Sequence, residues 1–142
     1  MILGCDVDGT FTKRSLPNPS IPLPQVLYLP FWPFFALSKP DPLIVNVLRE
    51  WKNRGAMICF VSARHGFLYE MTERQIKESR APMDKLICVG AGKGTKQRKL
   101  EAIRKNRIDL FFDDNRKVVT FLRENGANAH SREALFEMLV VG

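Results

Sequence analysis

The chain has 142 residues and a mass of 16.3 kDa, and this length suits one folded domain because single hydrophobic cores usually take roughly 100–200 residues. Its 45% hydrophobic and 26% charged residues exclude disordered, collagen-like and coiled-coil chains, and three cysteines without a CxxC pair, beside two histidines, argue against a disulfide framework and a structural zinc site. The net charge of +7 favours an anionic partner, such as nucleic acid, a phosphorylated metabolite or an acidic membrane surface, but selects none of them.

The amino-terminal residues predict a short buried strand followed by an acidic turn. Residues 1–5 are mostly apolar and run straight into Asp6-Val7-Asp8-Gly9-Thr10. This apolar start is much shorter than the h-region of a signal peptide. We therefore expect a reduced, cytoplasmic protein.

Residues 13–42 differ in composition from the rest of the chain, because they hold eight of its nine prolines. Within them, residues 26–37 are apolar, five of these twelve residues are aromatic, and two prolines interrupt the run. This run is too short and too broken to span a bilayer, which needs roughly 20 apolar residues. An aromatic surface of this size is expected to be covered, either over a binding site or against a second subunit in a homo-oligomer. A contact with a membrane surface is the alternative.

From residue 41 onward the pattern becomes regular. Asp41 and Pro42 supply an N-cap and a first-turn proline, and Gly55 supplies a stop. The predicted elements that follow are a helix over 42–55, a strand over 56–61, a helix over 67–79, a strand over 86–89, a helix over 96–107, a strand over 109–112, a helix over 116–124, a strand over 127–129 and a terminal helix capped by Ser131. Strands that alternate with helices of about ten residues predict an α/β fold, a parallel sheet covered on both faces.

Unusual polar residues follow each of the first four predicted strands. They are Asp6 and Asp8, then Ser62 and Arg64, then the glycine-rich stretch 90–96, then Asp113 and Asp114. The carboxyl ends of parallel strands meet at one edge of the sheet, where ligands bind in such folds. We therefore expect these residues to form one site.

The residue types in this set indicate phosphoryl transfer. Four carboxylates at one edge repel one another and require a cation, and Mg²⁺ is the hard ion that carboxylates bind while it shares a substrate phosphate. One aspartate could attack phosphorus and form an aspartyl-phosphate. A second aspartate two residues later could serve as general acid and then general base, while a serine hydroxyl and a lysine ammonium hold the phosphoryl oxygens.

Four motifs in the chain resemble those of the haloacid dehalogenase (HAD) superfamily of phosphohydrolases. Residues 6–10 resemble the first motif, 61–64 the second, Lys96 the third and 111–114 the fourth. The resemblance implies a Rossmann-like three-layer αβα sandwich with a sheet of five parallel strands in the order 5-4-1-2-3, in one domain over 1–142. It also implies that residues 13–41 are a flap or minimal cap, and that the enzyme is a Mg²⁺-dependent phosphatase.

The same resemblance assigns roles to individual residues. It implies that Asp6 is the nucleophile and Asp8 the general acid and base. The residues it implies in phosphate or substrate binding are Gly9, Thr10, Ser62, Ala63, Arg64 and Lys96, and the metal site comprises Asp6, Asp8, Asp113 and Asp114. For the third motif Lys96 is preferred because Leu100 and Ile103 follow at a helical spacing; Lys99 is the second choice and Lys93 the third.

A narrower resemblance is to the 3′-phosphatase domain of polynucleotide kinase. It rests on residues 61–64, 69–76 and 112–115, and it implies that Arg64 is a second phosphate or nucleotide contact. The substrate could then be a nucleotide or a polynucleotide 3′-phosphate end, and a small phosphometabolite is the alternative. A function of another class also stays open, namely a non-catalytic module that docks through the aromatic insert. A nucleotide kinase is disfavoured, because the stretch 90–95 lacks the earlier glycine of a P-loop.

Overall fold

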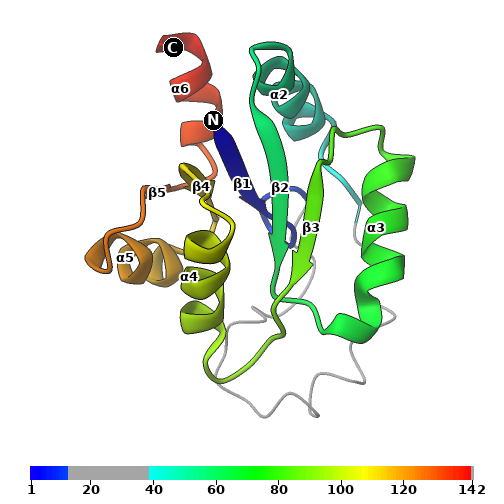
Figure 1. The fold of residues 1–142 in the computed structure, drawn as a ribbon. Coiled ribbons are helices and arrows are strands. Elements are labelled where there is room, and N and C mark those ends of the chain that lie inside the picture. The colour runs from blue at the N-terminus through cyan, green and yellow to red at the C-terminus, as the bar shows by residue number, and fades with distance from the viewer. Residues whose placement is uncertain (13–38, 142) are drawn as a thin grey trace.

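The computed structural model describes residues 1–12 and 39–141, and these form a single α/β layer structure (Figure 1). Strands and helices alternate along the chain as the sequence predicts. The elements are β1 (Ile2–Asp6), α2 (Pro42–Asn53), β2 (Met57–Ser62), the short 3₁₀ helix η2 (Gly66–Leu68), α3 (Tyr69–Glu78), β3 (Lys85–Cys88), α4 (Thr95–Lys105), β4 (Leu110–Phe112), α5 (Arg116–Glu124), β5 (Ala129–His130) and α6 (Ala134–Val141).

The five strands form one parallel sheet in the order β3-β2-β1-β4-β5. This is the predicted order 5-4-1-2-3 read from the other edge, so the prediction is confirmed. β1 is central: Cys5 lies beside Phe60 of β2 on one side and Phe112 of β4 on the other. As a result, the residues that follow β1, β2 and β4 leave the sheet next to one another.

Two hydrophobic cores flank the sheet, because successive strand residues point to opposite faces. On one face Leu3 and Phe60 pack with residues of α2, α3 and α6. On the other face Val61 and Phe111 pack with residues of α4 and α5. The helices therefore cover both faces of the sheet, as in the predicted three-layer sandwich (Figure 1).

The helix boundaries agree with the local sequence signals, with two differences. Asp41 accepts a hydrogen bond from the backbone N–H of Leu43 and caps α2 as predicted. The helix predicted over 67–79 begins as the 3₁₀ turn η2 before α3. The terminal helix begins at Ala134, three residues after Ser131, because residues 132–133 form a turn first.

Most of the predicted insert, 13–41, lies outside the described residues, and so does the segment 26–37 that was expected to cover a binding site or to pack against a second subunit. Its two ends are described and lie together: Thr12 pairs with Pro40, and the backbone N–H of Asp41 donates to the carbonyl of Phe11 over 2.8 Å. The chain thus leaves and rejoins the fold at neighbouring points. Within residues 1–12 and 39–141, no helix combines the length and the apolar character needed to cross a bilayer.

Candidate active site

The turn after β1 connects the first and fourth motifs. Asp6 is the last residue of β1, and Gly9 has a φ of 86°, a left-handed conformation that glycine adopts without steric strain and that lets the chain fold back. The Thr10 hydroxyl donates to Asp6 Oδ2 over 3.4 Å and accepts the backbone N–H of Asp114 over 3.0 Å. Thr10 therefore holds the two acidic motifs against each other.

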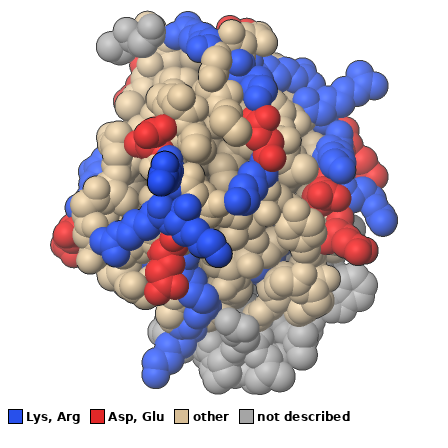
Figure 2. Space-filling model, in the orientation of Figure 1, with Lys and Arg blue, Asp and Glu red and all other residues tan. Residues whose placement is uncertain are grey.

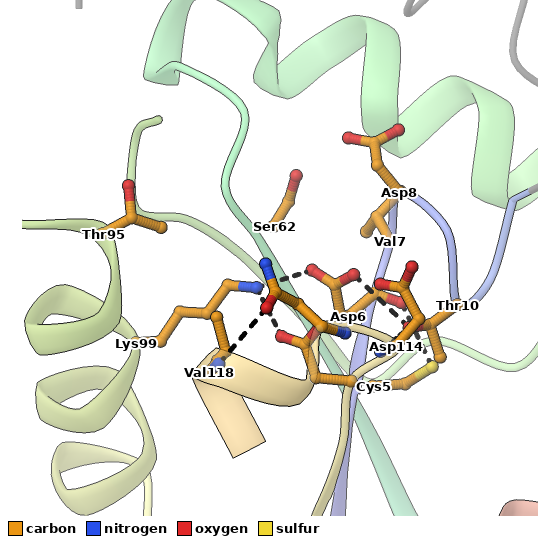
Figure 3. A network of polar contacts seen from close by, with 12 residues as sticks. Cys5, Asp6, Val7, Asp8, Thr10, Ser62, Thr95, Lys99, Asp114 and Val118 are labelled. Atoms are coloured by element: carbon orange, nitrogen blue, oxygen red, sulfur yellow. Dashed lines mark hydrogen bonds and ion pairs between the residues drawn. The ribbon is translucent and has the colours of Figure 1, made fainter. Parts of the chain in front are cut away.

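A buried lysine joins the carboxylates of Asp6 and Asp113. Lys99 reaches from α4, and its Nζ lies 2.9 Å from Asp6 Oδ1 and 2.6 Å from Asp113 Oδ2 (Figure 3). The side chains of Lys99, Asp6 and Asp113 are only 4%, 5% and 1% exposed, so water screens these ion pairs little. Such charge-assisted hydrogen bonds are stronger than those between neutral groups.

The buried cluster carries more negative than positive charge. Burial, together with the negative charges of Asp113 and Asp114, raises the pKa of Asp6 well above its ordinary value, although Lys99 opposes this shift. Burial alone would lower the pKa of Lys99, but the attraction of Asp113 and Asp6 raises it instead. At neutral pH the lysine therefore keeps its proton, and one positive charge faces several carboxylates.

The remaining negative charge fits a bound cation. Asp6, Asp113 and Asp114 each offer a carboxylate oxygen, and these three oxygens all lie within 4.8 Å of one another. Hard divalent ions such as Mg²⁺ prefer oxygen ligands of this kind. The carboxylate of Asp8, which the resemblance also implied as a ligand, is not part of this group.

Asp8 is instead held by Arg64. The guanidinium donates from Nε to Asp8 Oδ2 over 3.0 Å and from a terminal nitrogen to Asp8 Oδ1 over 2.8 Å, a bidentate pair. Its other terminal nitrogen donates to the hydroxyl of Thr72 and the side-chain carbonyl of Gln75, both on α3. Arg64 is fully buried, so the structure directs it toward Asp8 rather than toward the surface where a nucleotide would bind. Figure 3 shows the Asp8 carboxylate pointing away from the Asp6–Lys99 pair.

The structure places Lys99 at the site, whereas the sequence favoured Lys96 for that position. Lys99 lies among the buried positions of α4, beside Thr95, Leu100 and Ile103, and so faces the sheet edge. Lys96 is exposed on the first turn, with its Nζ 5.4 Å from the ring centroid of Phe121. The preference for Lys96 is therefore corrected: the cation in contact with Asp6 is Lys99. The spacing of Leu100 and Ile103 did not separate the two lysines, because Leu100 lies one helical turn after Lys96 and Ile103 lies one turn after Lys99.

The remaining predicted residues lie around this cluster. Ser62 is the last residue of β2, and its Oγ accepts the backbone N–H of Arg64 over 3.0 Å, which leaves the hydroxyl proton available to another acceptor. Ala63 is buried beside it. Asn115, rather than Asp113 or Asp114, caps α5 by accepting the N–H groups of Lys117 and Val118. Neither aspartate therefore serves as the N-cap of α5. Thr72 and Gln75 were not predicted from the sequence, because their contact with Arg64 depends on how α3 packs.

No protein-family model matches the chain. A curated protein of Halalkalibacterium halodurans named "Putative nucleotidase BH1399" is 36% identical over 69 residues, which are 49% of this chain and 32% of that protein. Among solved structures, a chain of the Pnkp1/Rnl/Hen1 RNA repair complex is similar with a TM-score of 0.68 and 20% identity, over 91% of this chain and 41% of that one.

Two further solved structures are similar over most of their length. One is a haloacid dehalogenase-like hydrolase from Streptococcus pneumoniae, with a TM-score of 0.61 and 11% identity over 90% of this chain and 82% of that one. The other is the D,D-heptose 1,7-bisphosphate phosphatase of B. bronchiseptica, complexed with magnesium and phosphate, with a TM-score of 0.59 and 10% identity over 90% and 78%.

These similarities identify the fold. The chain has the fold of the haloacid dehalogenase-type phosphatases, which confirms at the level of the fold the resemblance that its motifs indicate. The chain spans about a third of the curated relative and less than half of the RNA-repair chain.

Proposed function

We propose that the chain is a Mg²⁺-dependent phosphatase that hydrolyses phosphate monoesters through an aspartyl-phosphate on Asp6. The observation that carries this proposal is the contact of Lys99 with both Asp6 and Asp113, because it joins the ends of β1 and β4 in one buried acidic site. Asp6 would be the nucleophile: one of its carboxylate oxygens attacks phosphorus, and the bond between phosphorus and the ester oxygen breaks.

Asp8 would serve as the general acid and base. It follows Asp6 by two residues, and the bidentate contact with Arg64 keeps its carboxyl group in one orientation. In the first step Asp8 would give a proton to the leaving oxygen. In the second step it would take a proton from the water that attacks the phosphorus of the aspartyl-phosphate, which frees phosphate and regenerates Asp6.

The other polar groups would bind and orient the phosphate. The Ser62 hydroxyl keeps a proton to donate to a phosphoryl oxygen, and Lys99 holds the Asp6 carboxylate by its Oδ1 atom. Asp6 with Asp113 or Asp114 would hold Mg²⁺, and the ion would supply positive charge that lets an anionic phosphate approach an anionic nucleophile.

The names of the similar proteins favour a substrate derived from nucleic acid. One is named as a nucleotidase, and another belongs to an RNA repair complex. The net charge of +7 agrees with such a substrate. The alternative, a small phosphorylated metabolite, is favoured by the similarity to a heptose bisphosphate phosphatase.

Hydrolysis of an aryl phosphate such as p-nitrophenyl phosphate, with and without Mg²⁺, tests the proposal. We expect turnover that requires Mg²⁺ and that falls roughly 10³-fold or more in Asp6→Asn, because that change removes the nucleophile. Asp84→Asn is the matched control, since Asp84 also pairs with a lysine but lies at the other end of the strands. Unchanged turnover in Asp6→Asn would contradict the assigned roles. If no phosphate ester is hydrolysed at all, the non-catalytic binding module becomes the better reading.

A further inference from the structure

A basic groove runs along α5 beside Lys96 in the first turn of α4. It has a volume of ≈ 360 Å³ and is lined by Lys96, Arg116, Lys117, Thr120, Phe121 and Glu124. Three of these side chains are cations and one is an anion. None of the three cations forms an ion pair with a carboxylate of the described residues. They are therefore free to meet an anionic ligand.

The groove also offers an aromatic surface. The Phe121 ring lies beneath the ammonium of Lys96, with 5.4 Å between Nζ and the ring centroid. Phe121 is half-buried, and cations beside an aromatic ring are the combination with which proteins bind single-stranded nucleic acid, because phosphates meet the charges and bases stack on the rings. An acidic polypeptide would use the charges but not the ring.

Residues that line the groove are close in sequence to residues of the proposed reaction centre. Asp113 and Asp114 lead through the cap residue Asn115 directly into Arg116 and Lys117. On the other side, Lys96 precedes Lys99 by one turn of α4. On the face shown in Figure 2, lysine and arginine side chains gather over the region that α4 and α5 occupy in Figure 1. An anionic chain that begins at Asp6 could therefore continue over these cations.

We propose that this groove binds the phosphodiester backbone of a single-stranded nucleic acid whose terminal phosphate lies at Asp6. This inference rests on the proposed function and deepens it, because it makes a polynucleotide end the substrate rather than a mononucleotide. A mononucleotide presents one phosphate, which the reaction centre occupies. An oligonucleotide presents further phosphates, and those are the groups that Lys96, Arg116 and Lys117 would neutralise.

The salt dependence of hydrolysis gives a quantitative test. We compare kcat/KM for a nucleoside monophosphate and for an eight-nucleotide strand with the same terminal phosphate, in 3′- and 5′-phosphorylated forms. Each phosphate contact on single-stranded nucleic acid contributes about −0.7 to the slope of log affinity against log salt. Three contacts then predict that kcat/KM for the strand falls roughly 20-fold between about 50 and 200 mM salt, relative to the monophosphate.

A pair of matched double variants assigns the effect to the groove. In Arg116→Gln/Lys117→Gln the slope for the strand should become shallower by about 1.4, the equivalent of two contacts. The control, Arg74→Gln/Lys77→Gln, removes one arginine and one lysine that are exposed on α3, in the opposite helical layer, and should leave the slope unchanged. Taking the ratio to the monophosphate cancels any general effect of a substitution on the chemistry.

Three results would contradict the proposal that the groove binds nucleic acid. The first is an equal kcat/KM for the monophosphate and the strand at every salt concentration. The second is an unchanged slope in Arg116→Gln/Lys117→Gln. The third is competition by polyglutamate as strong as by an unreactive oligonucleotide, which would indicate an acidic protein partner. A failure of the proposed function looks different, because then no substrate is hydrolysed. In that case fluorescence anisotropy with an unphosphorylated oligonucleotide still tests whether the groove binds nucleic acid, by comparing the affinity of the wild type with that of Arg116→Gln/Lys117→Gln.

Discussion

Two lysine–aspartate pairs lie at opposite ends of the sheet and differ in charge balance. At the amino ends of the strands, Lys52 Nζ lies 2.7 Å from both carboxylate oxygens of Asp84, and the backbone N–H of Ile58 donates to the same carboxylate. At the carboxyl ends, Lys99 is divided between Asp6 and Asp113. The first pair is partly exposed, with side chains 41% and 28% accessible, whereas the second is buried.

The two aspartates have opposite pKa shifts for this reason. Burial would raise the pKa of Asp84, but the hydrogen bonds from Lys52 and Ile58 overcome it and lower the pKa. Burial and neighbouring carboxylates raise the pKa of Asp6 despite Lys99. Asp84 is thus satisfied by the protein alone and supports the fold. The Asp6 cluster has more carboxylates than cations, and such perturbed titratable groups are frequent at functional sites.

Removing each lysine should show the largest difference between the two pairs. Lys99→Met leaves buried carboxylates without their cation, so we expect a loss of about 3–5 kcal/mol in the free energy of unfolding and at least roughly 10²-fold in kcat. Lys52→Met should cost less than about 1 kcal/mol, since its ion pair is partly exposed. Denaturant unfolding and aryl phosphate turnover measure both. Equal losses of stability in the two variants would contradict the contrast.

Magnesium should stabilise the folded protein by binding at the carboxyl ends of the strands, and not at Asp84. A ligand that binds the folded state alone adds about 2.7 kcal/mol at 100 times its Kd, so Mg²⁺ should raise the Tm of the wild type. The increase should disappear in Asp113→Asn, which replaces an anionic carboxylate ligand by a neutral amide, and persist in Asp84→Asn. Thermal unfolding with and without chelator gives the comparison. A wild-type Tm that does not change in millimolar Mg²⁺ would contradict the assignment of the cluster as a metal site.

Arg64 and Asp8 form an intermediate case, a buried pair with one cation for one carboxylate. Arg64→Lys keeps the charge but loses the bidentate geometry, and we expect kcat to fall roughly 10- to 100-fold. The loss should be larger for an alkyl or nucleoside phosphate than for p-nitrophenyl phosphate, because the nitrophenolate leaves without a proton. An equal loss for both leaving groups would mean that Arg64 supports the fold rather than the general acid.

The pH dependence of stability gives the smallest effect, with opposite signs for the two aspartates. In chelator, the raised pKa of Asp6 means that stability should fall as pH rises from the unfolded value of about 3.9 toward the folded pKa. The lowered pKa of Asp84 means that its contribution is present above about pH 3.9 and is lost as pH falls below it. Unfolding of Asp6→Asn and Asp84→Asn between roughly pH 3 and 7 separates the two, since each substitution should remove one trend.

Local signals in the sequence were sufficient for most of the fold. Apolar runs of strand length and helical spacing with recognisable caps lie where the strands and helices form. The continuous apolar character of the run 56–61 correctly predicted a strand between two covering layers. These features depend on neighbours along the chain and on which face is buried, and both are visible in a sequence.

The charged side chains of the site were harder to predict, because their partners come from distant segments. Choosing Lys99 over Lys96 required knowing that the first turn of α4 lies against Phe121 of α5. The binding of Arg64 to Asp8 required the packing of α3, which brings Thr72 and Gln75 to the same guanidinium. A long side chain can reach several neighbours, so its contact is decided only when the helices are in place.

The order of residues along this chain was enough to determine a parallel sheet with acidic groups at the carboxyl ends of β1 and β4. Only the packed structure decided which lysine those groups share, which aspartate an arginine holds and which cations remain at the surface. The reason is physical: secondary structure follows from short-range backbone and burial preferences, whereas the pairing of buried charges depends on distances that exist only after the layers have come together.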